Sequence, residues 1–284
     1  MQIASALLVA LASAGTQARE LRVCADPNNL PFSNREEQGF ENRIVQIVAR
    51  ELHAQVRYTW WAQRRGSLRE TLQARLCDVI PGVASRVAAV ATTHPYYRSA
   101  YVFVTRSQRA LLLSGFDDPR LRALIVGVQM IGDDSSNTPP AHALARRGLV
   151  DNVRGYMLYG DYASDGPARV IVDDVARGVV DVAVVWGPLA GYYALRHGGA
   201  LRLQLVSPLE DAGVLPMVFD VSMGVRREDR SLRAELDEAL ARRAAQVYYV
   251  LREYGVPLLQ GDRLVSAPDG PFETRGRITS PDER

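Results

Sequence analysis

The sequence contains no lysine, and all 34 basic residues of the 284-residue chain are arginine. They are nearly balanced by 32 acidic residues, which leaves a formal charge of +2 at pH 7. A chain this close to neutral has no general electrostatic attraction for nucleic acid or for an acidic membrane surface, so neither is predicted as a partner. Because every basic side chain is a guanidinium, each can make planar, bidentate contacts with carboxylates.

Histidine is scarce, and the common catalytic motifs are missing. The four histidines lie singly along the chain, without the HxxxH or HExxH spacing that holds a metal ion. The sequence also has no P-loop, no GxGxxG turn and no GxSxG nucleophile elbow. It therefore predicts no metal ion, no cofactor and no catalytic residue, which favours a protein that is not an enzyme.

Long apolar runs are absent except near the first residue. Residues 1–18 carry no charge, and their apolar stretch, Ile3 to Ala14, is too short to span a bilayer and leads into small residues. This pattern predicts a signal peptide cleaved near Ala18, a periplasmic mature protein and no membrane span in that protein. No basic residue precedes the apolar stretch, so a misplaced start or a buried N-terminal helix stays open as the alternative.

The sequence does contain short apolar strands that alternate with amphipathic helices. In its first part the pattern predicts a strand at Leu21–Ala25, a helix over about Phe40–Leu52, a strand at Val56–Thr59, a second helix, and a strand at Val79–Val83. This βαβαβ order is typical of an open α/β sheet. Ligands of such sheets bind in a crevice at the carboxyl ends of the strands.

The alternation restarts beyond Arg106, which indicates a second α/β unit. Its strands are predicted at Leu124–Val128, Val153–Tyr159, Asp181–Trp186 and Leu201–Val206. A strand at Val221–Arg226 and one long helix over about Arg230–Tyr254 then return to the first unit. We therefore expect lobe 1 to comprise residues 21–106 and 218–262, lobe 2 to be inserted as residues 107–217, and two crossings near Thr105 and Ser207 to act as hinges. The Pro- and Gly-rich segment 267–284 is predicted to be a flexible tail.

Cysteine is limited to two residues, Cys24 and Cys77, which fall at or beside strands of the first unit. The first and third strands of such a unit are neighbours, so the two thiols can come within bridging distance. In an oxidising compartment they are expected to form a disulfide, the alternative being two buried free thiols. Neither belongs to a CxxC pair, which disfavours zinc or thioredoxin chemistry.

Several runs of this sequence resemble a known protein family. The runs DPNNLPFSN, GFENRI and CDVIPGV resemble periplasmic solute-binding proteins of type 2, family 3, whose two α/β lobes close on a small ligand. Longer runs, among them YTWWAQRRG, PYYRSAYVFVTR and NTPPAHALARRG, resemble the MxaJ/XoxJ accessory proteins encoded beside quinoprotein methanol dehydrogenases. The resemblance implies a two-lobed, type II binding-protein fold. It also implies a non-catalytic periplasmic factor that supports assembly or activity of a pyrroloquinoline-quinone (PQQ)-dependent methanol dehydrogenase.

The alternative is an extracellular receptor of the ABC-transporter type for a neutral or aromatic solute. Amino-acid receptors of the resembled family are expected to hold the ligand carboxylate with an arginine past the glycine of the third strand. Here Arg86 comes about three positions early, and Trp186 stands where a second-lobe carboxylate would hold the ligand ammonium. An amino acid is therefore not the expected ligand.

The predicted cleft is lined by aromatic and mostly neutral polar side chains. The candidates are Asp26, Asn28, Asn29, Phe32, Trp60, Trp61, Ser85, Tyr96, Tyr97 and Trp186. Such a lining suits an apolar or planar ligand, or an inserted protein segment. Each aromatic residue is equally open to a core position, because adjacent tryptophans on one strand must point to opposite sides.

A partner protein could contact basic pairs or an aromatic run on the surface. The pairs are Arg64-Arg65 and Arg146-Arg147, and the run contributes Tyr156, Met157, Tyr159 and Tyr162. The alternatives are ordinary solvated charges and a buried strand with a tyrosine-rich end.

Overall fold

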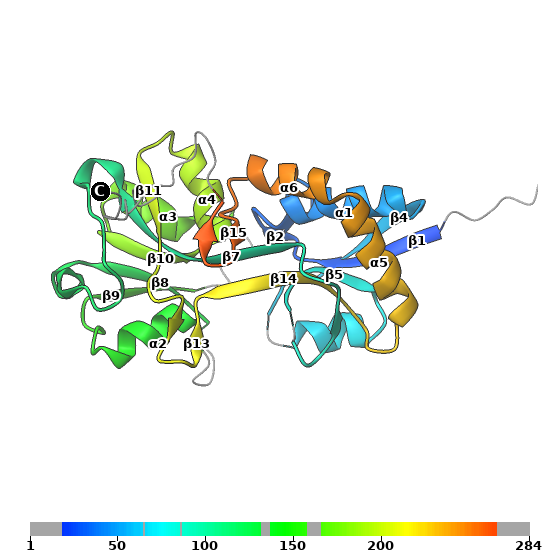
Figure 1. Ribbon diagram of the computed structural model, residues 1–284, viewed down its shortest axis with the longest axis horizontal. Coiled ribbons are helices and arrows are strands. Elements are labelled where there is room, and N and C mark those ends of the chain that lie inside the picture. The colour runs from blue at the N-terminus through cyan, green and yellow to red at the C-terminus, as the bar shows by residue number, and fades with distance from the viewer. Residues whose placement is uncertain (1–18, 65, 86, 132–136, 158–165, 266–284) are drawn as a thin grey trace, which may run out of the picture.

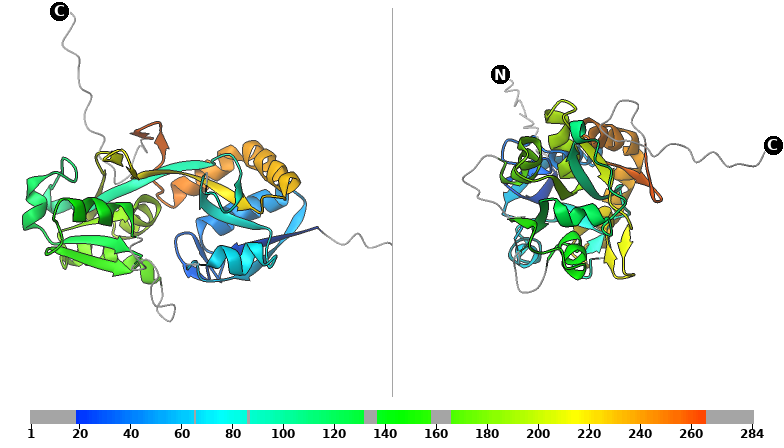
Figure 2. Two further views of the ribbon diagram at one scale, coloured as in Figure 1. Left: turned by 90° about the horizontal axis from the view of Figure 1, so that it is seen from below. Right: turned by 90° about the vertical axis from the view of Figure 1, so that its left-hand side faces the viewer.

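The computed structural model describes residues 19–64, 66–85, 87–131, 137–157 and 166–265, and these residues form two α/β bodies (Figure 1, Figure 2). One ten-stranded sheet runs through both, with the main order β4-β1-β5-β14-β7-β10-β8-β9. Strand β11 pairs with β7, and β6 pairs with β14. The predicted signal peptide 1–18 and the predicted tail 267–284 lie outside the described residues. Among the described residues, no helix is long and apolar enough to cross a membrane.

The first body contains the predicted βαβαβ unit. Its elements are β1 (Arg19–Ala25), β2 (Asn28–Asn29), β3 (Ser33–Asn34), α1 (Phe40–Glu51), β4 (Ala54–Trp60), the π-helical turn η1 (Arg69–Gln73), β5 (Val79–Ala84) and β6 (Ala91–Thr92). Strand β1 pairs in parallel with both β4 and β5, as the βαβαβ order requires. The helix predicted between β4 and β5 is short and contains the π-helical turn η1.

The second body repeats the alternation with its own strands and helices. Its elements are η2 (Ser107–Arg109), η3 (Pro119–Ala123), β8 (Val126–Met130), α2 (Pro139–Arg146), β9 (Val153–Met157), η4 (Pro167–Arg169), α3 (Val170–Arg177), β10 (Val182–Trp186), α4 (Gly187–Arg196), β11 (Leu201–Leu205), β12 (Glu210–Asp211) and β13 (Leu215–Pro216). Its sheet is buried on both faces. Along β7 the side chains alternate, so Val102 and Val104 pack with α3 and α4 while Tyr101 and Phe103 pack with α2.

Two long strands connect the bodies: β7 (Tyr97–Arg106) and β14 (Val218–Val225), which lie along the middle of the molecule in Figure 1. Residues 97–100 of β7 pair with β14, whereas residues 101–105 pair with β10 and 102–106 with β11. The change of partner thus falls at Ala100 and Tyr101, a few residues before the crossing expected near Thr105. The lobe boundaries and the hinge role of these strands stay predictions.

The C-terminal return departs from the predicted single helix. It forms α5 (Arg230–Arg242) and α6 (Ala244–Glu253), followed by the hairpin β15 (Leu259–Gln260) and β16 (Arg263–Leu264). The chain leaves helical geometry at Arg243, and the Nε atoms of Arg242 and Arg243 both lie 2.6 Å from the carboxylate of Glu51. Successive residues of a regular helix point in different directions, so the break brings both guanidinium groups to one carboxylate at the end of α1.

The disulfide predicted between Cys24 and Cys77 is confirmed. The two Cα atoms are 5.5 Å apart, and Val23 of β1 lies in register with Val79 of β5. The buried sulfurs pack with Leu72, Ile80 and Val90 in a small apolar cluster. The bridge therefore links the carboxyl end of β1 to the segment just before β5.

Candidate functional site

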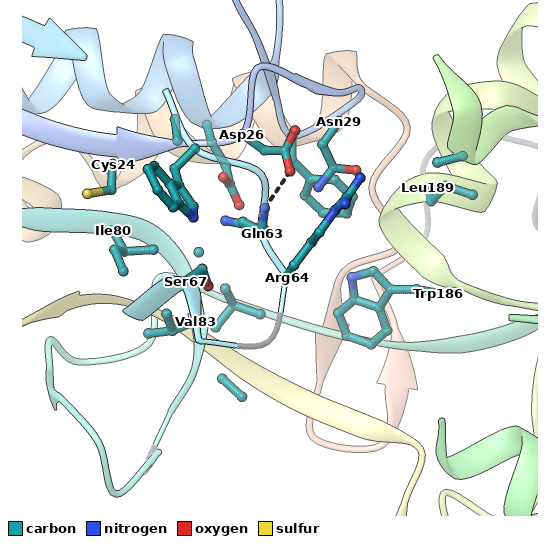
Figure 3. Close-up of a pocket in the computed structure, with 18 of the residues that line it drawn as sticks. Cys24, Asp26, Asn29, Gln63, Arg64, Ser67, Ile80, Val83, Trp186 and Leu189 are labelled. Atoms are coloured by element: carbon teal, nitrogen blue, oxygen red, sulfur yellow. Dashed lines mark hydrogen bonds between the residues drawn. The ribbon is translucent and has the colours of Figure 1, made fainter. Parts of the chain in front are cut away.

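A cleft of about 470 Å³ lies between the two bodies, at the carboxyl ends of their strands. Figure 3 shows Cys24, Ile80 and Val83 of the first body on one side, and Trp186 and Leu189 of the second body on the other. Its volume falls in the range of sites for small molecules, and most of its lining is apolar or aromatic with a few polar groups.

Hydrogen bonds to Asp26 connect the loop after β1 to the loop after β4. This side chain is only 1% exposed and accepts hydrogen bonds from the backbone N–H of Asn28 at 2.9 Å and of Gln63 at 2.8 Å. The second bond is the dashed line in Figure 3. Asp26 therefore places one negative charge at the cleft and fixes the two loops that carry Asn28, Asn29, Gln63 and Arg64.

The loop from β1 to α1 packs tightly because a glycine precedes the helix. A Cβ atom on Gly39 would lie 1.9 Å from the carbonyl oxygen of Phe32, so only glycine fits this approach. The side chain of Asn42 accepts hydrogen bonds from the backbone N–H of Gly39 at 3.1 Å and of Asn34 at 3.3 Å. These contacts explain why DPNNLPFSN and GFEN occur together: they build one wall of the cleft.

Glu41, the second residue of α1, also lines the cleft. It is 4% exposed, and its carboxyl group has no hydrogen-bond or ion-pair partner among the described residues. Burial, together with the nearby charge of Asp26, raises its pKa to about 8. The group is therefore mostly protonated at neutral pH and can donate a hydrogen bond.

Aromatic rings from the second body and the linking strands form the far wall. Trp186 packs against Tyr101, with ring centroids 5.3 Å apart, and against Phe219 at 5.7 Å. The backbone N–H of Trp186 donates to Gln129 Oε1 at 3.1 Å, and Gln129 itself lines the cleft. Edge-to-face rings of this kind offer a large apolar surface to a planar ligand.

Two hydrogen bonds join the bodies at the edge of the cleft. The hydroxyl of Tyr193 on α4 donates to the carbonyl of Leu30 at 3.2 Å, and the backbone N–H of Gly166 donates to Asn28 Oδ1 at 3.4 Å. They connect the loop after β1 to the helical layer of the second body.

The structure brings most of the predicted cleft residues together. Those that line the cleft are Asp26, Asn28, Asn29, Phe32, Trp61, Tyr97 and Trp186. Three others lie outside the lining. Trp60 stacks on Tyr58 at 4.5 Å, while the Ser85 and Tyr96 hydroxyls are engaged with Ser222 at 2.6 Å and with the Pro81 carbonyl at 2.8 Å. Trp60 is the last residue of β4, and Trp61, which follows it, is 44% exposed and lines the cleft.

Several lining residues do not belong to the predicted cleft set. They are Glu41, Gln63, Arg64, Tyr101, Gln129 and Phe219. Gln129 could be predicted from the sequence, because it lies near the end of β8 and ligands bind at strand ends. The role of Glu41 could not be predicted, because the residues at a helix start do not show which buried carboxyl group lacks a partner.

The predicted partner-contact residues occupy different environments. Arg64 lines the cleft, and the Tyr156 hydroxyl donates to Asp174 at 2.6 Å, so neither is a plain surface group. Met157 is 56% exposed. The remaining candidates, Arg65, Tyr159 and Tyr162, and the displaced anchor Arg86 lie outside the described residues. Within those residues no group of three metal-ligating side chains occurs.

Comparisons with known proteins place this fold in a family. Residues 21–250 match the model of bacterial extracellular solute-binding proteins, family 3. The chain is 33% identical over 259 residues to Protein MoxJ of Methylorubrum extorquens, covering 87% of this chain and 84% of that protein.

Two solved structures are also similar. Periplasmic binding protein XoxJ from Methylobacterium extorquens AM1 is 38% identical with a TM-score of 0.69, covering 84% of this chain and 99% of that one. MxaJ from Methlophaga aminisulfidivorans MPT is 26% identical with a TM-score of 0.71, covering 84% of this chain and 100% of that one. The resemblance seen in the sequence and the two-lobed binding-protein fold are therefore confirmed.

Proposed function

The chain belongs to the bacterial extracellular solute-binding proteins, family 3, and we propose that it is a periplasmic, non-catalytic accessory factor of a PQQ-dependent methanol dehydrogenase. The observation that carries the proposal is the similarity to MoxJ, XoxJ and MxaJ across most of the chain. The sequence runs that resemble the MxaJ/XoxJ proteins lie at the end of β4, in β7 and in α2, and so span both bodies.

The cleft supports a role other than amino-acid capture. In the described residues, β10 ends at Trp186 and continues into Gly187 and Pro188, so no carboxylate stands there to meet a ligand ammonium. The aromatic wall occupies that place instead. Among the described residues, the cleft thus lacks the carboxylate after β10 that an amino-acid receptor is expected to use, which is consistent with a task performed on another protein.

Co-purification tests the proposal. Tagged residues 19–284 are incubated with purified methanol dehydrogenase and with apo-dehydrogenase lacking its quinone, and both retention and methanol oxidation are measured. We expect retention of at least one form and higher activity after reconstitution with the accessory protein. Absence of both effects would refute the proposal.

Met157 gives a site-directed version of this test. It is 56% exposed at the end of β9, and exposed methionine is enriched in protein interfaces. We expect Met157→Asp to weaken retention, whereas Tyr249→Asp on α6, where the side chain is 71% exposed, serves as the matched control. Equal retention of both variants would remove Met157 from the contact surface.

The cleft itself favours a second candidate, a receptor for a neutral or aromatic solute. Its volume of about 470 Å³ suits a small molecule. A thermal-shift panel of PQQ, alcohols and amino acids distinguishes the two, because a ligand that binds only the folded state raises the melting temperature. A saturable shift without dehydrogenase retention would favour the receptor.

A further inference from the structure

Glu41 presents an unused hydrogen-bond donor to the cleft. Its side chain is 4% exposed, lies at the start of α1 and has no partner within the described part of the chain. Its carboxyl group lines the cleft, so a molecule held there can accept this hydrogen bond.

Neighbouring groups decide the charge state of Glu41. The carboxylate of Asp26, just after β1, acts on it. Tyr58 of β4, Tyr96 just before β7 and Tyr97 at the start of β7 lie within its electrostatic reach. Burial raises the pKa of both Tyr96 and Tyr97, so these hydroxyls stay neutral. Burial and the charge of Asp26 act in the same direction on Glu41 and favour the acid form.

The described lining also carries a cation. Arg64 lines the same cleft, where Figure 3 shows its side chain pointing toward the loop that carries Asn29. It makes interactions of its own.

We propose that the cleft binds a neutral, planar molecule whose carbonyl oxygen accepts a hydrogen bond from the protonated carboxyl of Glu41. The ring of the ligand would lie against the aromatic wall of Tyr101, Trp186 and Phe219. Asp26 and Arg64 place one charge of each sign on the lining, which favours neither a cation nor an anion. The acid form of Glu41 is matched by a neutral acceptor.

This inference deepens the receptor candidate and is independent of any dehydrogenase partner. Loss of dehydrogenase retention would leave it standing, and its own failure would leave the co-purification result untouched. The two outcomes are therefore separable.

Titration calorimetry with three one-ring probes tests the proposal. Benzamide carries a neutral carbonyl, toluene carries no polar group, and benzyltrimethylammonium carries a fixed positive charge. At pH 6.5 we expect benzamide to bind most tightly of the three. At pH 9.5 its dissociation constant should rise roughly tenfold or more, because Glu41 has released its proton.

Two variants of Glu41 separate the effect of its hydrogen-bond donor from the effect of its titration. Glu41→Gln keeps an N–H donor that does not titrate, so benzamide should still bind and its affinity should no longer depend on pH. Glu41→Leu removes the donor, and the preference for benzamide over toluene should vanish at both pH values. Circular dichroism confirms that each variant is folded.

Several results would overturn the proposal. They are tighter binding of benzyltrimethylammonium than of benzamide, a pH-independent benzamide affinity in the unaltered protein, and no binding of any probe at millimolar concentration. A carbon-13 titration of the Glu41 carboxyl that falls near the ordinary value would also overturn it. Since this titration needs no ligand, it gives a decision even if a variant fails to fold.

Discussion

Gly82 of β5 lies directly against the carboxyl group of Glu41, so that a Cβ atom at position 82 would be 2.0 Å from Glu41 Oε1. Both residues line the cleft. The glycine thus leaves the space in which the end of the glutamate side chain is buried. This contact joins two sequence motifs, GFENRI and CDVIPGV, that are far apart along the chain.

A Gly82→Ala substitution should displace the Glu41 carboxyl toward the cleft. The φ angle at Gly82 is not positive, so alanine fits the backbone and the conflict is with the movable end of the glutamate. We expect a loss of about 1 kcal/mol in the free energy of unfolding and a Glu41 pKa closer to its ordinary value. Urea denaturation and carboxyl titration measure the two effects.

A double-mutant cycle supplies the control for this change. In a Glu41→Ala background the side chain that conflicts with the introduced methyl group is gone, so the cost of Gly82→Ala should largely disappear. An unchanged cost there would show that another contact requires the glycine.

Replacement of Glu41 by glutamine should change how stability depends on pH. In the folded protein the Glu41 pKa is about 8, whereas the ordinary value is 4.5. Between these values the folded state holds a proton that the unfolded chain has released, so stability falls as pH rises, by about 1.4 kcal/mol per pH unit. Urea unfolding from pH 5 to pH 8 should show this loss relative to Glu41→Gln. Parallel stability curves for the two proteins would contradict the assignment.

Removal of the Cys24–Cys77 bridge should destabilise the first body. The two cysteines are 53 positions apart, and the loop-entropy model gives such a bridge up to about 4 kcal/mol. The double Cys→Ala variant should melt at a lower temperature than the oxidised protein. A reductant should lower the melting temperature of the parent toward that of the variant while leaving the variant unchanged; if it shifts both equally, the reductant acts elsewhere.

Arg147 should prove structural rather than a partner contact. Its Nη2 lies 2.7 Å from Oδ1 of Asp211, whose side chain is 4% exposed, and Asp117 binds the same guanidinium. We expect Arg147→Met to lower the free energy of unfolding by about 3 kcal/mol, because it leaves a buried carboxylate unpaired. The exposed neighbour Arg146 provides the matched control as Arg146→Met.

The pH dependence of the Arg147–Asp211 pair has a definite sign. The hydrogen bond from Arg147 holds the pKa of Asp211 below its ordinary range. The stabilisation is present above the pKa of the unfolded chain and is lost as pH falls through the lower, folded value. Adding Asp211→Asn to Arg147→Met should recover part of the stability. No recovery would mean that the loss comes from packing rather than from charge.

Much of the architecture could be predicted from local patterns. Apolar alternation and helix-start residues located α1 and most of the strands, and topology placed Cys24 beside Cys77, because parallel strands one crossover apart are neighbours. The break at Arg243 could not be predicted in this way. It accompanies the binding of two arginines to Glu51, a residue nearly two hundred positions away.

The candidate site also combines features that the sequence predicts with features that it does not predict. Strand-end reasoning proposed Asp26, Phe32, Trp61 and Trp186 for the cleft, and all four line it, but it left open which of Trp60 and Trp61 would face the cleft, and it gave Arg147 to the surface. In each case the local pattern allowed two orientations. Contacts with distant segments selected one of them.

By itself the sequence determined the α/β alternation, the family resemblance and the disulfide partners, because each depends on residue spacing and on neighbours in a sheet. The tertiary structure alone decided which side chains face the cleft and which carboxyl keeps its proton there. The physical reason is that a pKa and a side-chain environment depend on burial and on nearby charges, and segments remote in sequence supply both at Glu41.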